Sequence, residues 1–418
     1  MSQDRFGSIK QRAKEPVNFA PGAWLFPGFG NSGLLETDQG LVLVDLPVAP
    51  PAAEQLRRIT SRVPGPVHTV FLTHGHLDHA CDLEPLFELA QRRGQPPPRI
   101  VAQRNLPRRL RKYRMLDGYH QMINRLQFQV PPDQSALPPP TRDPDLLFDQ
   151  RLELEVGGVE LTAFHARGET DDALWLWVPG QKTVFAGDLV IYSFPNVGNP
   201  LKVQRYTLEW AQALDDILAR EPEYLVPGHG PLLAGRERIQ EVLGKTAKAL
   251  RYLHREVVER LNAGMWYQDI LHQVKLPPEL MDDPFLAPRY GCPTFVIHGI
   301  LREYTGWYDG NPSNLFPPRR ELVARELARL AGSALLLERA RYLARQDQTA
   351  LALQLVDLVL EGDPEGEQNR QAHRLKGELL AGLARREKCF IAWSILQQGA
   401  RAEMDKARES NQRGAPPA

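Results

Sequence analysis

Cysteine is scarce in this sequence. The 418 residues include only 3 cysteines, Cys81, Cys292 and Cys389, which lie far apart. A small, odd number of scattered cysteines excludes a dense disulfide framework and predicts reduced thiols, which is typical of cytoplasmic proteins. Cys81 follows His79 by two positions, so it is either a small buried side chain or a thiol close to the histidine-rich stretch described below.

A surplus of one charge, a long apolar run and a secretory leader are missing as well. Lys and Arg together number 51, as do Asp and Glu, so no overall field favours nucleic acid or an acidic membrane surface. No apolar run approaches the length of a membrane span. The first 15 residues mix charge with Gly and Ser and contain no apolar leader. We therefore expect a cytoplasmic protein that binds no nucleic acid and has no membrane span.

The chain is longer than one hydrophobic core ordinarily requires, so we expect two domains. Short apolar runs alternate with helical spacing as far as residue 244, which indicates α/β layers. From Lys245 onward the apolar residues follow long helical periodicity, which indicates an all-α domain. The expected divisions are an N-terminal arm over residues 1–21, an α/β domain over 22–244, a helical domain over 245–402 and a frayed polar tail over 403–418.

The secondary structure expected from this patterning falls into two groups. Strands are expected at residues 23–26, 31–36, 40–45, 69–72, 100–102, 152–156, 159–163, 173–178, 183–186 and 224–226, with helices at 52–61 and 83–93. Antiparallel helical hairpins resembling tetratricopeptide packing are expected at residues 321–330, 334–345, 350–361, 369–383 and 392–401. The strongly basic residues 104–114 are either a solvated helix face or an anion-attracting rim.

The most informative stretch is the sequence THGHLDH at residues 73–79, which follows the apolar run 70–72. It holds three imidazoles and one carboxylate, and Gly75 allows the backbone to turn sharply between them. Neutral imidazole suits zinc, and a carboxylate completes a mixed nitrogen and oxygen shell. The alternative is a His-rich surface turn without a metal. We expect two cation positions, one held by His74 and His76 and the other by Asp78 and His79.

This HxHxDH pattern resembles the metallo-β-lactamase superfamily of binuclear hydrolases. The resemblance implies an αββα sandwich in the first domain, and two later segments extend it: Gly187-Asp188 at a strand end and the sequence PGHG at residues 227–230. It implies that Asp188 bridges the two cations and that His229 is the last ligand of the second. An acid at the position of Asp45 commonly supports the metal loop in the superfamily, although a turn residue is equally plausible there.

The third ligand of the first cation differs from most of the superfamily. Most members have a histidine where this chain has Glu169, and a glutamate at this position resembles the alkyl sulfatases of the superfamily. Carboxylate oxygen is a competent zinc ligand, so the site tolerates the exchange. His165 is an alternative ligand, but its position matches a non-coordinating histidine in relatives, which favours a supporting role. The implied first cation is held by His74, His76 and Glu169.

The helical half resembles the alkyl sulfatase dimerisation domain, most clearly in the sequence GWYDGNP at residues 306–312. By composition alone this string is a turn between helices. The combined resemblance implies a homodimeric enzyme that cleaves a small sulfate ester with an apolar tail to an alcohol and inorganic sulfate. Two divalent cations, with zinc favoured by the number of imidazoles, would lower the pKa of a shared water to about 7 and so supply a bridging hydroxide. Asp78 and Asp188 are the expected catalytic carboxylates.

The substrate is the least constrained part of this prediction. Relatives place sulfate-gripping residues between the bridging acid and the last histidine, and the candidates here do not match the family's spacing. A thioester, a lactone or a phosphoester is therefore an alternative substrate, and a non-catalytic dimerising scaffold is a further alternative. Arg205 suits two oxyanion oxygens but also suits a surface ion pair. The candidate substrate-binding residues are Asn196, Lys202 and Arg205.

Overall fold

The computed structural model describes residues 15–47, 51–80, 82–131 and 142–413. It divides into two compact units. The first comprises the chain up to Ile123 together with Gln134–Gly306, and the second comprises Asn124–Asp133 together with Trp307–Ala418. The domain divisions expected from the sequence stay a prediction. The division between compact units falls after residue 306, whereas the expected domain boundary lies after residue 244.

Two mixed sheets form the centre of the first unit. The seven-stranded sheet has the strand order β1-β2-β3-β4-β5-β6-β7, and the six-stranded sheet has the order β13-β12-β11-β10-β9-β8. The first sheet consists of β1 (Val17–Ala20), β2 (Ala23–Phe26), β3 (Ser32–Thr37), β4 (Gly40–Val44), β5 (Val67–Leu72), β6 (Arg99–Gln103) and β7 (Leu146–Phe148). The second consists of β8 (Arg151–Val156), β9 (Val159–His165), β10 (Leu174–Val178), β11 (Thr183–Ile191), β12 (Tyr224–His229) and β13 (Leu233–Ala234).

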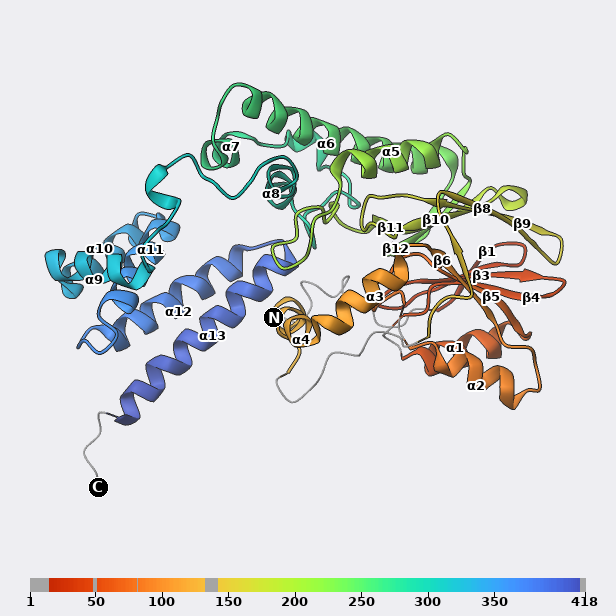
Figure 1. Cartoon of the computed structure of the whole chain (residues 1–418), viewed down its shortest axis with the longest axis horizontal. Coiled ribbons are helices and arrows are strands. Elements are labelled where there is room, and N and C mark those ends of the chain that lie inside the picture. The colour runs from red at the N-terminus through yellow and green to blue at the C-terminus, as the bar shows by residue number, and fades with distance from the viewer. Residues whose placement is uncertain (1–14, 48–50, 81, 132–141, 414–418) are drawn as a thin grey trace. The chain divides into compact units, whose positions relative to one another are not determined.

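Helices cover the outer face of each sheet. Figure 1 shows α1 and α2 beside the first sheet and α5 and α6 beside the second. The helices up to Gly306 are α1 (Ala52–Arg62), α2 (Glu84–Arg92), α3 (Leu106–Met115), α4 (Asp117–Phe128), α5 (Thr207–Leu218), α6 (Arg236–Asn262), α7 (Tyr267–Gln273) and α8 (Pro293–Tyr304). The division between the two units falls within α4. The αββα sandwich predicted from the resemblance is confirmed.

The alternation of side chains along β4 explains the layers. Leu41 and Leu43 pack in the core formed with α1, α2 and α3, whereas Val42 and Val44 pack in the core between the two sheets. Successive side chains of a strand point to opposite faces, so an all-apolar strand requires a covering layer on both sides. Trp175 of β10 packs likewise in the core formed with α5, α6 and α8.

The second unit is helical. Its helices are α9 (Arg320–Ala331), α10 (Ser333–Arg345), α11 (Thr349–Gly362), α12 (Asn369–Arg386) and α13 (Phe390–Arg413), and Figure 1 shows α12 and α13 as a helical hairpin. Buried apolar residues of α10, α11 and α12, among them Leu337, Val356 and Ala372, form one core. Among the described residues, no helix combines the length and apolarity that crossing a bilayer requires.

Several elements differ from the prediction. Strand β1 forms within the expected N-terminal arm, because it pairs with β2. Helix α13 continues to Arg413, so the tail expected to fray after Arg401 is helical as far as the described residues extend. The polar residues there do not interrupt a helix because most of them have good helix propensity. Neither Cys292 nor Cys389 forms a disulfide within the described part of the chain, and Cys81 lies outside it.

Candidate metal centre

The seven predicted ligands lie on or next to β5, β9, β11 and β12. The loop after β5 carries the histidine-rich stretch, the turn between β9 and β10 carries Glu169, β11 carries Asp188, and β12 ends at His229. Gly228 permits the closest approach among these segments, because a Cβ at this position would lie 2.1 Å from Asp188 Oδ1. The structure thus brings together all seven side chains that the sequence singled out.

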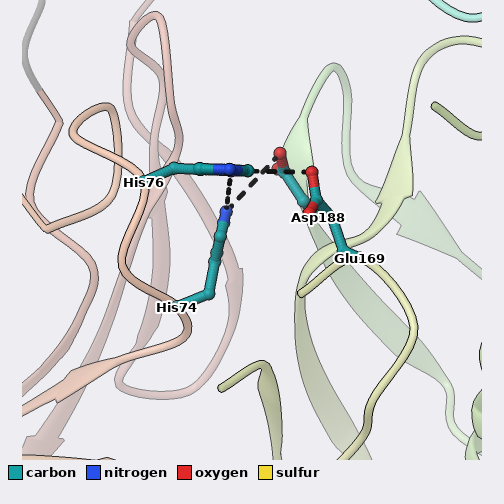
Figure 2. Close-up of side chains that lie close together, drawn as sticks. All are labelled: His74, His76, Glu169 and Asp188. Carbon is teal, nitrogen blue, oxygen red and sulfur yellow. Dashed lines mark hydrogen bonds and ion pairs between the residues drawn. The ribbon is translucent and has the colours of Figure 1, made fainter. Parts of the chain in front are cut away.

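Four of these side chains converge in a first cluster, shown in Figure 2. The Nε2 atom of His74 lies 2.8 Å from Nδ1 of His76 and 3.8 Å from Oδ2 of Asp188. Glu169 Oε1 lies 3.5 Å from Nδ1 of His76. Each of the four residues offers one possible ligand atom, and these four atoms all lie within 4.8 Å of one another. The cluster therefore presents two nitrogens and two carboxylates to one small volume.

The remaining three side chains form a second cluster beside the first. Asp78 Oδ2 and His79 Nε2 each lie 3.3 Å from His229 Nε2. Asp188 also reaches this cluster, with Oδ1 3.1 Å from His79 Nε2 and 3.3 Å from His229 Nε2. One oxygen of Asp188 thus faces each cluster, which is the arrangement that a bridging carboxylate requires.

The first cluster fits a divalent cation. Two ligand nitrogens about 2.0–2.1 Å from one tetrahedral zinc would lie about 3.3 Å apart, which resembles the separations observed here. The Oε2 atom of Glu169 is buried, and no described residue forms a hydrogen bond with it. Burial, together with the charge of His79, lowers the pKa of His74 to about 3, and burial holds the pKa of His76 well below its usual value. Both imidazoles are therefore neutral and keep a lone pair for a cation.

The second cluster has the opposite protonation. Burial alone would lower the pKa of His229, but the charge of Asp188 and the hydrogen bonds of Asp188 and Asp78 raise it to about 10. The carboxylates of Asp188 and Asp45 likewise outweigh burial and raise the pKa of His79. Without metal, protons on His79 and His229 therefore balance the negative charge of the carboxylates. A cation that binds to these imidazoles displaces the protons.

Asp45 supports the histidine-rich loop. Its carboxylate accepts hydrogen bonds from the backbone N–H of Thr73 at 2.7 Å and from the Thr73 hydroxyl at 2.6 Å. Its Oδ2 also lies 2.7 Å from Nδ1 of His79, which turns Nε2 of that imidazole toward the second cluster. His165 lies outside both clusters, and its Nε2 is 3.0 Å from the backbone oxygen of Asp171.

Two family models match this chain. The model described as metallo-β-lactamase superfamily matches residues 25–229, the part of the chain that carries both clusters. This part of the chain is a metallo-β-lactamase domain. The model described as alkyl sulfatase dimerisation matches residues 267–405, downstream of the metallo-β-lactamase domain.

Three proteins with similar sequences are alkyl sulfatases. A linear primary-alkylsulfatase of Pseudomonas sp. (strain ATCC 19151) is 30% identical over 44% of this chain and 36% of its own length. The alkyl/aryl-sulfatase BDS1 of Saccharomyces cerevisiae is 22% identical over 82% of this chain and 56% of its own length. An (R)-specific secondary-alkylsulfatase of Pseudomonas sp. is 25% identical over 84% of this chain and 57% of its own length. The chain therefore spans between about a third and just over half of these relatives.

A solved structure shares the fold over nearly the whole chain. The stereoselective inverting sec-alkylsulfatase Pisa1 from Pseudomonas sp. superposes with a TM-score of 0.82 over 99% of this chain and 70% of that one. Sequence identity is 19%, so the likeness establishes the architecture of the metallo-β-lactamase domain and the helical region that follows it.

The candidate substrate-binding residues lie in the segment between β11 and α5. Arg205 forms an ion pair with Glu169, and both residues are buried. The alternative prediction of an ion pair at the surface is therefore wrong. Asn196 is buried, and within the described part of the chain its Oδ1 has no hydrogen-bond partner. Burial and the nearby charge of Arg205 lower the pKa of Lys202 to about 8. Arg205 and Lys202 thus lie beside the clusters, because Arg205 pairs with Glu169 and Lys202 is influenced by the charges of Asp78 and Glu169.

Two features near the clusters were not identified from the sequence. Arg109 is buried rather than part of a solvated helix face, and it pairs with Asp171 and Asp172. Tyr290 has a pKa well above its usual value because of burial and the negative charge of Asp78. Sequence spacing offers no signal for these residues, because each is far from the histidine-rich motif along the chain and its type is common in loops and helices.

Proposed function

We propose that this protein hydrolyses alkyl sulfate esters to an alcohol and inorganic sulfate with two divalent cations, which we take to be zinc. The observation that carries the proposal is the pair of donor clusters that share Asp188 and lie beside Arg205 and Lys202. The names of the similar proteins support the sulfate ester as substrate. When bound, the two cations supply an activated water and polarise the ester oxygens.

The roles of the protein side chains follow from their positions. We assign His74, His76 and Glu169 to the first cation, and Asp188 to both. The second cation is assigned to Asp78, His79 and His229. Asp78 and Asp188 act as the catalytic carboxylates, because each faces the volume between ligands where the ester would react. Asp45 and His165 hold the surrounding loops in place.

Lys202, Arg205 and Asn196 are proposed to bind the sulfate group. The guanidinium of Arg205 pairs with the carboxyl group of Glu169, whose pKa burial raises to about 8, and it lies where it can orient a sulfate that approaches the first cluster. Lys202 adds a second positive charge, and Asn196 adds a buried side-chain amide whose Nδ2 is the atom that could donate to a sulfate oxygen. This set of charges favours an anionic ester over a neutral lactone or thioester.

The substrate class is tested by comparing esters with the same apolar tail. The purified protein is loaded with zinc and incubated separately with dodecyl sulfate, dodecyl phosphate and a dodecyl thioester, and each product is measured. We expect turnover of the sulfate with kcat/KM well above that of the other two. Preferential turnover of the phosphate or the thioester would retain the metal centre and overturn the substrate. Absence of turnover with all three, in protein that holds two metals, would favour a non-catalytic scaffold.

The partner proposed for the helical unit is a second copy of the chain. Helix α9 buries its small side chains, with Ala324 0% and Ala328 8% exposed, and presents its large ones, with Leu330 84% exposed. This inverted pattern leaves an apolar face on a helix within the region that matches the dimerisation model. The exposed apolar side chains of this face and its neighbourhood are Phe316, Leu322, Val323, Leu327, Leu330 and Leu335.

Oligomeric state tests this partner directly. Sedimentation of the wild-type protein is expected to show a dimer, and Leu330→Glu is expected to shift it to the monomer because the new charge would be buried in the interface. Met115→Glu is the control, since Met115 is an exposed apolar residue of α3 in the other unit. A dimer that survives Leu330→Glu would contradict the proposed surface. The cytoplasmic location and the absence of nucleic acid remain predictions from the sequence.

A further inference from the structure

A buried ion pair lies directly behind the first cluster. Arg109 and Asp172 are 7% and 0% exposed, and Arg109 Nε lies 2.6 Å from Asp172 Oδ1. The other carboxylate oxygen, Asp172 Oδ2, accepts a hydrogen bond of 2.8 Å from the backbone N–H of Gly75. Gly75 is the residue between His74 and His76. One buried carboxylate is thus shared between an arginine and the backbone that joins two proposed ligands.

The pair is itself held by several contacts. Arg109 also pairs with Asp171, and its Nη1 donates to the Tyr113 hydroxyl at 3.3 Å. Asn105, at the start of α3, donates from Nδ2 to the backbone oxygen of Asp171 at 2.9 Å. The arginine therefore has little freedom to move, and the turn that carries Asp172 is fastened to α3.

The backbone of Gly75 packs closely against this pair. A Cβ at residue 75 would lie 2.9 Å from Arg109 Cδ and 3.1 Å from Asp172 Oδ2, so the backbone packs directly on both side chains. His74 and His76 leave the chain on either side of this fixed peptide. Nε2 of His74 and Nδ1 of His76 lie 2.8 Å apart. The positions of these two ring nitrogens therefore depend on the orientation of the backbone at Gly75.

We propose that Asp172, held by Arg109, is a positioning residue that sets the geometry of His74 and His76 for the first cation. The inference rests on the proposed function insofar as these two histidines are metal ligands. Asp172 touches neither cation nor substrate and acts through the backbone N–H that it accepts. Groups that orient metal ligands typically change metal affinity by about 10–100-fold when they are removed.

The test is metal binding by Asp172→Asn, measured without reference to activity. The metal-free protein is titrated with Co²⁺ and followed by its visible absorption, and zinc affinity is measured by competition with a chromogenic chelator. We expect one of the two sites to lose affinity by about 10–100-fold with an altered cobalt spectrum, while the other site keeps its affinity. Wild-type affinity and spectrum at both sites would overturn the proposal.

The chain provides a matched control in Asp283→Asn. Asp283 is 5% exposed, its Oδ1 lies 3.0 Å from Arg238 Nη2, and the same oxygen accepts the backbone N–H of Phe285 at 2.8 Å. It therefore repeats the chemistry of Asp172 in the same unit but contacts no proposed ligand. We expect Asp283→Asn to bind both metals as the wild type does. Equal loss of metal in both variants would show a general effect of the lost ion pair and would overturn the positioning role.

Two further measurements keep the outcome decisive. If Asp172→Asn does not fold by circular dichroism, Arg109→Lys, which keeps the positive charge, is titrated instead, with the same expected and contradicting results. Wild-type protein that binds two metals but releases no sulfate would overturn the proposed substrate alone. Unchanged metal binding in the variant would overturn the positioning role alone.

Discussion

Gly198 lies where the segment that carries the three proposed sulfate-binding residues crosses helix α8. A Cβ at residue 198 would lie 1.4 Å from the backbone oxygen of Phe295 and 2.9 Å from the backbone nitrogen of Gly299. Non-bonded carbon and oxygen atoms ordinarily remain about 3.4 Å apart, so Gly198→Ala requires the segment or α8 to move by about 2 Å.

The effect of this displacement on catalysis is expected to be large. A shift of about 1 Å in a substrate-positioning group can lower the rate about 100-fold, so kcat/KM for dodecyl sulfate should fall at least about 100-fold, which corresponds to about 2.7 kcal/mol. Metal content should remain near that of the wild type, because none of the seven proposed ligands lies in the segment between β11 and α5.

Two other glycines calibrate the measurement. A Cβ at Gly299 would lie 3.1 Å from Gly198 Cα, so Gly299→Ala requires a shift of only a few tenths of an ångström and should have an intermediate effect. A Cβ at Gly244, within α6, would meet no atom within 4 Å, so Gly244→Ala should leave kcat/KM unchanged. Melting temperature and metal content are recorded for each variant. A folded Gly198→Ala protein with wild-type kcat/KM would refute the reasoning.

Three further predictions concern charge, metal and stability. Burial lowers the pKa of Lys202 to about 8, so its positive charge is lost as pH rises through that value. KM for the sulfate should therefore increase above about pH 8, and Lys202→Met should abolish this pH dependence of KM. Asp45→Asn removes the carboxylate that orients His79 and should weaken metal binding by about 10–100-fold, as measured by chelator competition. Trp210 is fully buried and donates to the backbone oxygen of Leu189 at 2.9 Å, so Trp210→Ala should lower the free energy of unfolding by about 3–5 kcal/mol in urea titrations.

Local patterns explain why much of this architecture could be predicted from the sequence. An all-apolar strand such as β4 requires cover on both faces, and a ligand set compressed into residues 73–79 leaves few alternatives. The strands predicted at 152–156 and 159–163 are joined by Gly157 and Gly158, and both glycines have positive φ, which glycine adopts without strain. The assignment of individual metal ligands stays a prediction, although the seven side chains lie together.

What could not be predicted depends on contacts between distant parts of the chain. Arg109 is one of several arginines in a basic stretch, and only the fold shows that it is the one that turns inward to Asp172, 63 residues away. Arg205 was an ambiguous candidate because its partner, Glu169, lies across the site rather than nearby in sequence. Strand β1 was missed because a strand of four residues depends on its pairing with β2 for its structure. The extension of α13 past Arg401 was missed because the polar residues there show no apolar periodicity, although their helix propensity permits a helix.

The central claim is that the two donor clusters hold metals that support hydrolysis of an alkyl sulfate. The most direct measurement is sulfate release from dodecyl sulfate by chelator-treated protein, followed while zinc is added back in known amounts. We predict no release from the metal-free protein and full activity once about two zinc ions are bound per chain. Sulfate release that persists without metal, or protein that binds two zinc ions and releases no sulfate, would contradict the account.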